Sequence, residues 1–356
     1  MKTGFNIVLA LGGIFALFLT IGTFIADWER PPVETVQIGY RGVGTQQVIN
    51  PRTEAGRAVT LPTVYDPAPP GGQPAREVYQ NVQILGDLTE DEFNRVMVAI
   101  TDWVAPEDEG CAYCHNLENL AEDVPTKIIS RRMFQMTRTI NENWTDHVAE
   151  TGVTCYTCHR GQPVPAEIWF NHGGAGPTRG MAGYDAGQNH PALAAGLTSL
   201  PSDPFSGRVD SASEIRVVGE SALPSGQGAS IKDTEATYAL MIHMSEALGV
   251  NCTFCHNSRS FISWEQSNQS RIPAWHGIQM VRDINQNFVV PLTPLYAANR
   301  LGPQGDAPKA NCATCHRGQS KPLGGAQLAR DYPELNRVTL IPLAGPAVQS
   351  QPSTAQ

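Results

Sequence analysis

Cysteine and histidine recur in one short pattern, Cys-x-x-Cys-His, which occurs four times and uses all eight cysteines of the 356-residue chain. Two thiols at this spacing can bond the two vinyl groups of one porphyrin, while the adjacent imidazole reaches the iron. The pattern therefore predicts four covalently bound hemes of the c type. We number the four copies motifs 1 to 4 in chain order: Cys111, Cys114 and His115; Cys155, Cys158 and His159; Cys252, Cys255 and His256; Cys312, Cys315 and His316.

Other chemistry of paired cysteines explains this pattern less well. Zinc sites, thioredoxin-like redox pairs and disulfide frameworks all use cysteine pairs. None of them requires a histidine directly after the second cysteine in every copy. A chain of this length also needs no disulfides to form a core. Heme attachment is the interpretation that uses every residue of the motif.

The composition sets the general class of protein. The chain has 34 acidic and 25 basic residues, a formal net charge of −9, which disfavours nucleic acid as a partner and favours a basic protein. It also has 33 glycines and 27 prolines, which predict long irregular segments. We expect a mainly α fold with extensive coil, in which the hemes supply much of the core.

An apolar run at residues 7–26 is long enough to cross a bilayer as a helix. Lys2 precedes the run and Asp27 follows it. Cleavage of a signal peptide after Ala26 would place bulky Phe24 where a small residue is preferred. The sequence thus predicts an uncleaved transmembrane anchor with Lys2 in the cytoplasm and the rest of the chain on the periplasmic side.

Four predicted helices precede the motifs, at residues 88–106, 124–148, 233–250 and 273–290. Thr89 and Glu92 have the spacing of a capping box, and Pro125 suits the first position of a helix. These helices are the elements expected to hold the hemes.

The two halves of the chain align with each other. Met97 and Met241 are 144 residues apart, and the same offset relates Met136 to Met280 and Ile140 to Ile284. An internal duplication of a two-heme unit is the expected origin. The predicted segments are an anchor (1–28), an extended segment (29–75), a first diheme unit (76–170), a connection (171–230), a second diheme unit (231–325) and a C-terminal tail (326–356).

The second axial ligand of each iron is less defined by sequence. Six of the eight methionines lie in the predicted helices, where thioether ligation and core packing are both possible. The residue 144 positions after Met133 is Gly277, so the second half lacks one methionine and needs another ligand. Of five histidines outside the motifs (His147, His172, His190, His243 and His276), spacing favours His147 and His276 without deciding between them.

The phrases APEDEGCAYCH, NWTDHVAETGVTCYTCHRGQPVP and LGVNCTFCH resemble the tetraheme cytochrome c subunit of photosynthetic reaction centres of purple bacteria. The similarity extends from about residue 31 to about residue 325. In that family three hemes have Met/His ligation and one has bis-His ligation. The resemblance implies Met97, Met133 and Met241 as ligands of the first three hemes and His147 as the ligand of the fourth. It does not carry over the lipidated N-terminal cysteine of many members, because the first cysteine here is Cys111.

The resemblance also implies a function and partners. Electrons would pass from a soluble cytochrome c or a high-potential iron-sulfur protein to the photo-oxidised special pair of bacteriochlorophylls. The protein partners would be the L and M subunits, with the H subunit and light-harvesting proteins in the same complex. The chain would be an electron carrier and no enzyme, and Arg271 would match a family arginine near the third heme.

Carboxylates surround motif 1, with Glu107, Asp108 and Glu109 before it and Glu118, Glu122 and Asp123 after it. A basic donor could be steered to this surface. Two other functions stay open at this point. A multiheme reductase would need an iron with an open coordination site. A membrane-anchored quinol-oxidising relay would share the hemes and the anchor but reduce a different acceptor.

Overall fold

The chain forms helices joined by long irregular segments. The computed structural model describes residues 2–25, 34–37, 46–51, 58–171, 192–210, 213–217 and 230–336. The α-helices are α1 (Lys2–Ile25), α3 (Ala75–Val78), α4 (Glu90–Val104), α5 (Pro125–Asn143), α6 (Thr145–Val148), α7 (Cys155–His159), α8 (Ile231–Leu248), α9 (Arg271–Asp283), α10 (Cys312–His316) and α11 (Leu328–Asp331). The expected mainly helical class, with much coil, is confirmed.

Shorter elements complete the described part. The 3-10 turns are η1 (Gly110–Tyr113), η2 (Leu193–Ala195), η3 (Cys252–Phe254), η5 (Val290–Leu295), η6 (Ala298–Arg300), η7 (Pro322–Gly325) and η8 (Pro333–Leu335), and Ile284–Val289 is a π-helical segment, η4. Strands β1 (Glu34–Gln37) and β2 (Gln46–Ile49) pair antiparallel, with Glu34 opposite Ile49. This hairpin lies within the segment expected to be merely extended.

The N-terminal apolar run does form a helix, α1, whose large apolar side chains are exposed, including Phe15 and Phe18. Within the described residues, no helix has the length and apolar character that crossing a membrane requires. The prediction of a single-pass anchor at residues 7–26 is therefore not supported by the structure.

The helices that precede the motifs begin where local chemistry predicts. Thr89 caps α4 in a reciprocal capping box with Glu92, and Pro125 is the first residue of α5. Ser230 and Asp233 make the same kind of box at the start of α8. The predicted helix at 273–290 instead changes to π-helical geometry at Ile284. Local sequence signals thus fix the helix starts better than their ends.

Equivalent hydrogen bonds recur in the two halves, between residues that are 144 positions apart in the helices before the second motif of each half and 157 positions apart next to that motif. The side chain of Asn141 donates to the carbonyl of Val153 and accepts from its N–H, and Asn285 makes the same two bonds with Ala310. The glycine that ends each Cys-His-Arg-Gly sequence donates its N–H to a carbonyl in the last turn of the helix that precedes the first motif of the same half. Gly161 donates to Trp103 and Gly318 donates to Ala247.

The segment after motif 4 packs against the first half. Leu328, Tyr332 and Leu335 join a core with residues of α4 and α5, and Tyr332 is fully buried. Arg95 forms a buried ion pair with Glu334 (3.0 Å), and Arg138 donates to the carbonyl of the same residue. Residues 328–336, within the predicted C-terminal tail, are therefore an integral part of the folded chain.

The described parts of the predicted connection also contribute to a core. Phe205, Val209 and Ile215 are buried against Leu240 of α8 and Ile278 of α9. This second core lies under the helices that flank motif 3. Two of the histidines outside the motifs, His172 and His190, fall outside the described residues.

Candidate heme-binding site

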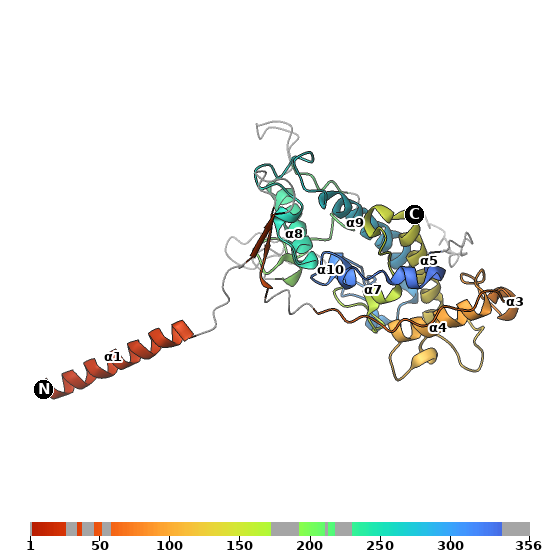
Figure 1. The fold of residues 1–356 in the computed structure, drawn as a ribbon, viewed down its shortest axis with the longest axis horizontal. Helices are drawn as coiled ribbons and strands as arrows, with labels where there is room; N and C mark the ends of the chain where they lie inside the picture. Colours follow the sequence, from red (N-terminus) through yellow and green to blue (C-terminus); the bar gives the residue numbers. More distant parts are fainter. Residues whose placement is uncertain are drawn as a thin grey trace, which may run out of the picture.

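The four motifs fold in two ways. Motifs 1 and 3 contain the 3-10 turns η1 and η3, whereas motifs 2 and 4 form the short α-helices α7 and α10. Figure 1 shows α7 and α10 beside each other, between α4 and α8, and these two motif helices are in contact. Motifs 2 and 4, which are the second motifs of their halves, therefore meet between α4 and α8.

One interaction is common to all four motif histidines. The ring Nδ1 lies 2.8 Å from the carbonyl of Gln162 in His159, of Phe261 in His256 and of Gln319 in His316. In His115 the Nδ1 is 3.4 Å from the carbonyl of Leu120. Because a carbonyl only accepts, Nδ1 carries the proton and Nε2 keeps its lone pair. That is the tautomer in which a histidine binds a metal through Nε2.

A fifth histidine has the same arrangement. His147 of α6 has its Nδ1 2.8 Å from the carbonyl of Pro273, and its ring centroid is 5.9 Å from that of His316. The two rings are inclined by 66°. Two imidazoles at this separation, each with Nε2 unprotonated, are chemically suited to hold one iron between them.

Gly277 of α9 provides the space for His147. A Cβ atom on Gly277 would lie 2.6 Å from Cε1 and 2.8 Å from Nδ1 of the imidazole. In the first half the equivalent position is Met133, 144 residues earlier. The position at which the second half lacks a methionine is therefore the position that His147 packs against. His276, the other candidate from spacing, lies beside Asp146, with its Nε2 3.9 Å from that carboxylate.

Burial keeps these histidines neutral. Desolvation lowers the pKa of His147, His159 and His256 and lowers that of His316 to about 4. Neutral imidazole is the form that coordinates metals, so the environment favours coordination at physiological pH.

The cysteines are all described and all unpaired. Burial raises the pKa of the Cys155 and Cys312 thiols to about 12 and that of Cys255 to about 11. Among the described residues, no three His, Cys, Asp or Glu side chains gather into a metal site. Two free thiols and an adjacent histidine at each motif are the groups that thioether attachment of a heme uses.

The predicted methionine ligands lie on the expected helices. Met97 on α4 is half-buried, and α4 contacts the turn of motif 1. Met133 lies one turn before Thr137, whose hydroxyl is beside the Cys155 thiol, so Met133 shares the face of α5 that meets motif 2. On α8, Met241 and Met244 both pack against the core that contains Leu240, and the structure does not separate them.

Two charged features predicted from sequence are also present. The Arg271 guanidinium donates to the carbonyl of Ser263 (3.0 Å), lies 4.0 Å from the ring centroid of Trp264 and acts electrostatically on Cys255 of motif 3. Around motif 1, Glu107, Asp108 and Glu109 are exposed. Asp123 is instead paired with Arg131 (2.8 Å) and Lys127 (3.8 Å), which weakens the predicted acidic ring on that side.

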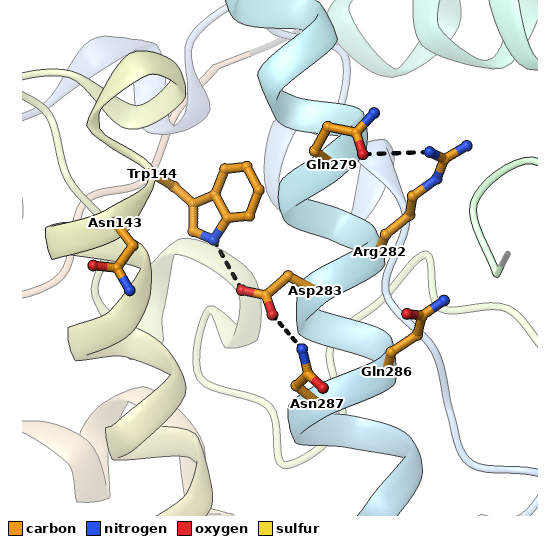
Figure 2. Close-up of a pocket in the computed structure, with 7 residues that line it drawn as sticks. All are labelled: Asn143, Trp144, Gln279, Arg282, Asp283, Gln286 and Asn287. Atoms are coloured by element: carbon orange, nitrogen blue, oxygen red, sulfur yellow. Dashed lines mark hydrogen bonds between the residues drawn. The ribbon is translucent and has the colours of Figure 1, made fainter. Parts of the chain in front are cut away.

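A polar pocket of about 400 Å³ between the end of α5 and α9 was not expected from the sequence. Figure 2 shows its central contacts: Trp144 Nε1 donates to Asp283 Oδ2 (2.9 Å), and the Asn287 side chain donates to Asp283 Oδ1 (2.6 Å). Trp144 directly precedes α6. The bond therefore joins the helix of His147 to α9. The NWTDHV phrase was the only sequence signal, and it does not identify Asp283.

Comparisons with known proteins agree with this site. The family model of the photosynthetic reaction centre cytochrome C subunit matches residues 29–336. The chain is similar to the photosynthetic reaction center cytochrome c subunits of three bacteria. It is 52% identical to that of Rubrivivax gelatinosus, over 89% of this chain and 87% of the relative. The identity is 47% for Thermochromatium tepidum (96% of this chain, 85% of the relative) and 45% for Roseobacter denitrificans (85% of this chain, 86% of the relative).

Each motif combines two free thiols with a histidine whose Nε2 is available to a metal, and this combination is typical of a c-type cytochrome. The chain belongs to the family of photosynthetic reaction centre cytochrome c subunits. As a member of that family it is an electron carrier of photosynthesis that contains heme c and associates with the reaction centre in the photosynthetic membrane.

Proposed function

We propose that the chain binds four c hemes, one at each motif, and passes electrons from a soluble periplasmic donor to the photo-oxidised bacteriochlorophyll pair. Heme supplies reversible one-electron chemistry at potentials that the protein sets. The observation that carries the proposal is the carbonyl at Nδ1 of every motif histidine, which leaves each Nε2 available for an iron. The chain is proposed to act as a relay without turnover of a substrate.

The second ligands are proposed to differ among the hemes. Met97, Met133 and Met241 serve the hemes of motifs 1, 2 and 3, and His147 serves that of motif 4. The position of His147 opposite His316, in the space that Gly277 leaves, supports the last assignment. Because Met/His ligation favours ferrous heme, the bis-His heme should have a lower potential than a comparable Met/His heme.

The four sites are proposed to form a row of two duplicated diheme units in the order motif 1, motif 2, motif 4, motif 3. The contact of α7 with α10 supports the central position of motifs 2 and 4 in this order. The bonds from Gly161 to Trp103 and from Gly318 to Ala247 tie each central motif to the helix or turn before its outer motif. The recurrence of these bonds, and of those made by Asn141 and Asn285, supports the duplication.

The two ends of the row differ in surface chemistry. Exposed carboxylates at Glu107, Asp108 and Glu109 lie directly before motif 1, which suits a soluble basic donor at this end. The motif 3 end has exposed Phe261, Ile262 and Trp264, and strand β2 contacts its turn. Apolar surface of this kind suits a permanent protein partner. We propose that electrons enter at motif 1 and leave at motif 3, toward the L and M subunits.

Other parts of the proposal concern tuning and location. The positive charge of Arg271 beside motif 3 should raise the potential of that heme. The heme-bearing part is proposed to face the periplasm, with the H subunit and light-harvesting proteins in the same complex. A protease added to intact spheroplasts, which expose the periplasmic face of the membrane, should cleave the heme-bearing part of the chain. Protection of that part from the protease in the same spheroplasts would contradict the location.

A flash experiment tests the relay. In membranes that contain the chain, a flash should oxidise c-type heme while the bacteriochlorophyll pair is re-reduced. In a strain that lacks the chain, re-reduction of the pair should be slow and no such heme signal should appear. Re-reduction that is equally fast without the chain would contradict the proposed function.

A further inference from the structure

The two arginines that follow motifs 2 and 4 cross between the motifs. Arg160 Nη2 donates to the carbonyl of Cys315 (3.1 Å), and Arg317 Nη2 donates to the carbonyl of Cys158 (2.9 Å). Each arginine is thus covalently next to one motif and hydrogen-bonded to the backbone of the other. The exchange is reciprocal, as in a contact with two-fold symmetry.

The backbone at these arginines is specialised in both copies. Arg160 and Arg317 end the helices α7 and α10 in the left-handed region, with φ values of 51° and 48°. A residue other than glycine is uncommon there, and such strain persists where the surroundings enforce it. Each arginine is followed by a glycine with positive φ, which continues the turn. The same costly turn occurs at both places where an arginine crosses to the other motif.

Among the described residues, the charge of Arg160 faces another cation and no carboxylate. The electrostatic neighbours of Arg160 are Arg317 and the Cys158, Cys315 and Tyr156 side chains, with no carboxylate among them. In both arginines Nε is buried and has no hydrogen-bond partner in the described part of the chain. Two like charges that lie close together and partly out of water repel each other, so this arrangement costs stability.

We propose that Arg160 and Arg317 form a cationic bridge between the two central heme sites and raise the reduction potential of both hemes. The inference rests on the proposed function, because it requires hemes at motifs 2 and 4. Ferric heme carries one more positive charge than ferrous heme, so a nearby fixed cation disfavours the ferric form. Because each guanidinium reaches across to the opposite motif, its charge acts on the neighbouring heme as well as on its own.

The test is a spectroelectrochemical titration of the full chain in isolated membranes, with all four hemes followed. Arg160→Gln should lower the potentials of the hemes at motif 2 and motif 4 together, and Arg317→Gln should do the same. The hemes at motifs 1 and 3 should shift less. The motif 4 heme can be assigned as the one whose potential changes with His147→Met.

Two further variants separate charge from structure. Arg160→Lys keeps the charge but not the guanidinium geometry, so its potentials should stay near those of the unmodified protein. Arg330→Gln removes an exposed arginine and should leave all four potentials unchanged. If Arg160→Gln accumulates poorly, Arg317→Gln and the lysine variants provide the same comparison.

The outcomes are distinguishable from those of the proposed function. A shift confined to the heme next to the mutated arginine, or an equal shift in Arg160→Lys and Arg160→Gln, would overturn the cationic bridge. A heme count below four per chain would instead contradict the proposed function. The count is measured on the same samples before titration.

Discussion

The imidazole of His147 lies directly beside Gly277, the position that corresponds in sequence to Met133 in the other half of the chain. A Cβ on Gly277 would come within 2.6 Å of the ring. The side chain faces His316, with 5.9 Å between the two ring centroids. A glycine on α9, in place of a methionine, thus leaves room for a histidine of α6 beside motif 4.

Substitution of Gly277 by alanine should disturb this site. Alanine favours the helix by about 1 kcal/mol, but the added methyl group must displace His147, which we expect to cost about 1–3 kcal/mol. The spectrum of one heme should lose low-spin character, and reduced protein should bind carbon monoxide. Gly13→Ala is the control, because no atom lies within 4 Å of a Cβ at that helical glycine. Unchanged low-spin spectra in Gly277→Ala would argue against His147 as a ligand.

Asp283 should act as a positioning residue for His147. Asp283→Ala removes the acceptor for Trp144 Nε1 and Asn287 Nδ2, with a loss of about 1–2 kcal/mol in stability for the main bond. Trp144 directly precedes α6, so the loss of its bond should loosen the helix that carries His147 and weaken the binding of His147 to the motif 4 heme iron. Carbon monoxide should then bind that heme in the reduced protein more than it does in the unmodified protein. Gln279→Ala, on the same pocket wall, is the control. Equal carbon monoxide binding in the two variants would refute the positioning role.

His243 should make the chain sensitive to acid. Burial lowers its pKa to about 4, below the ordinary value of about 6.5. The unfolded chain therefore takes up the proton first as the pH falls, and the free energy of unfolding should drop between about pH 6.5 and pH 4, by about 3 kcal/mol at most. Below about pH 4 both states are protonated and this contribution no longer changes.

Chemical unfolding at several pH values, with His243→Gln beside the unmodified protein, measures this effect. The variant should lose stability less steeply over that range. Thr237→Ser, at a buried position on the same helix, keeps a hydroxyl for the Ile215 carbonyl and should retain the full pH dependence. Parallel curves for His243→Gln and the unmodified protein would exclude His243 as the source.

The carboxylates before motif 1 should control the rate of donor association. The triple variant Glu107→Gln, Asp108→Asn, Glu109→Gln should slow heme reduction by a basic soluble donor severalfold at low ionic strength and flatten its salt dependence. Glu265→Gln, at an exposed carboxylate beside motif 3, should leave the rate unchanged. The same salt dependence in the triple variant would show that the donor does not use this surface.

The sequence predicted the features that depend on local chemistry. The capping box of Thr89, the helix start at Pro125 and the vacancy at Gly277 follow from residue types and spacing alone. The bond between Trp144 and Asp283 joins residues that are far apart in sequence, and Tyr332 is buried by residues of the first half of the chain. No local pattern could predict either feature. Arg160 and Arg317 each directly follow a motif histidine in the sequence, but their crossing depends on how α7 and α10 meet.

The number of covalently attached hemes tests the central claim most directly. Mass spectrometry of the intact chain, together with a pyridine hemochrome assay after acid–acetone extraction, gives the number of hemes bound per polypeptide. Four motifs with two thiols each predict four hemes that resist extraction. A chain with the mass of its polypeptide alone, or one that loses its heme to the extraction, would contradict it.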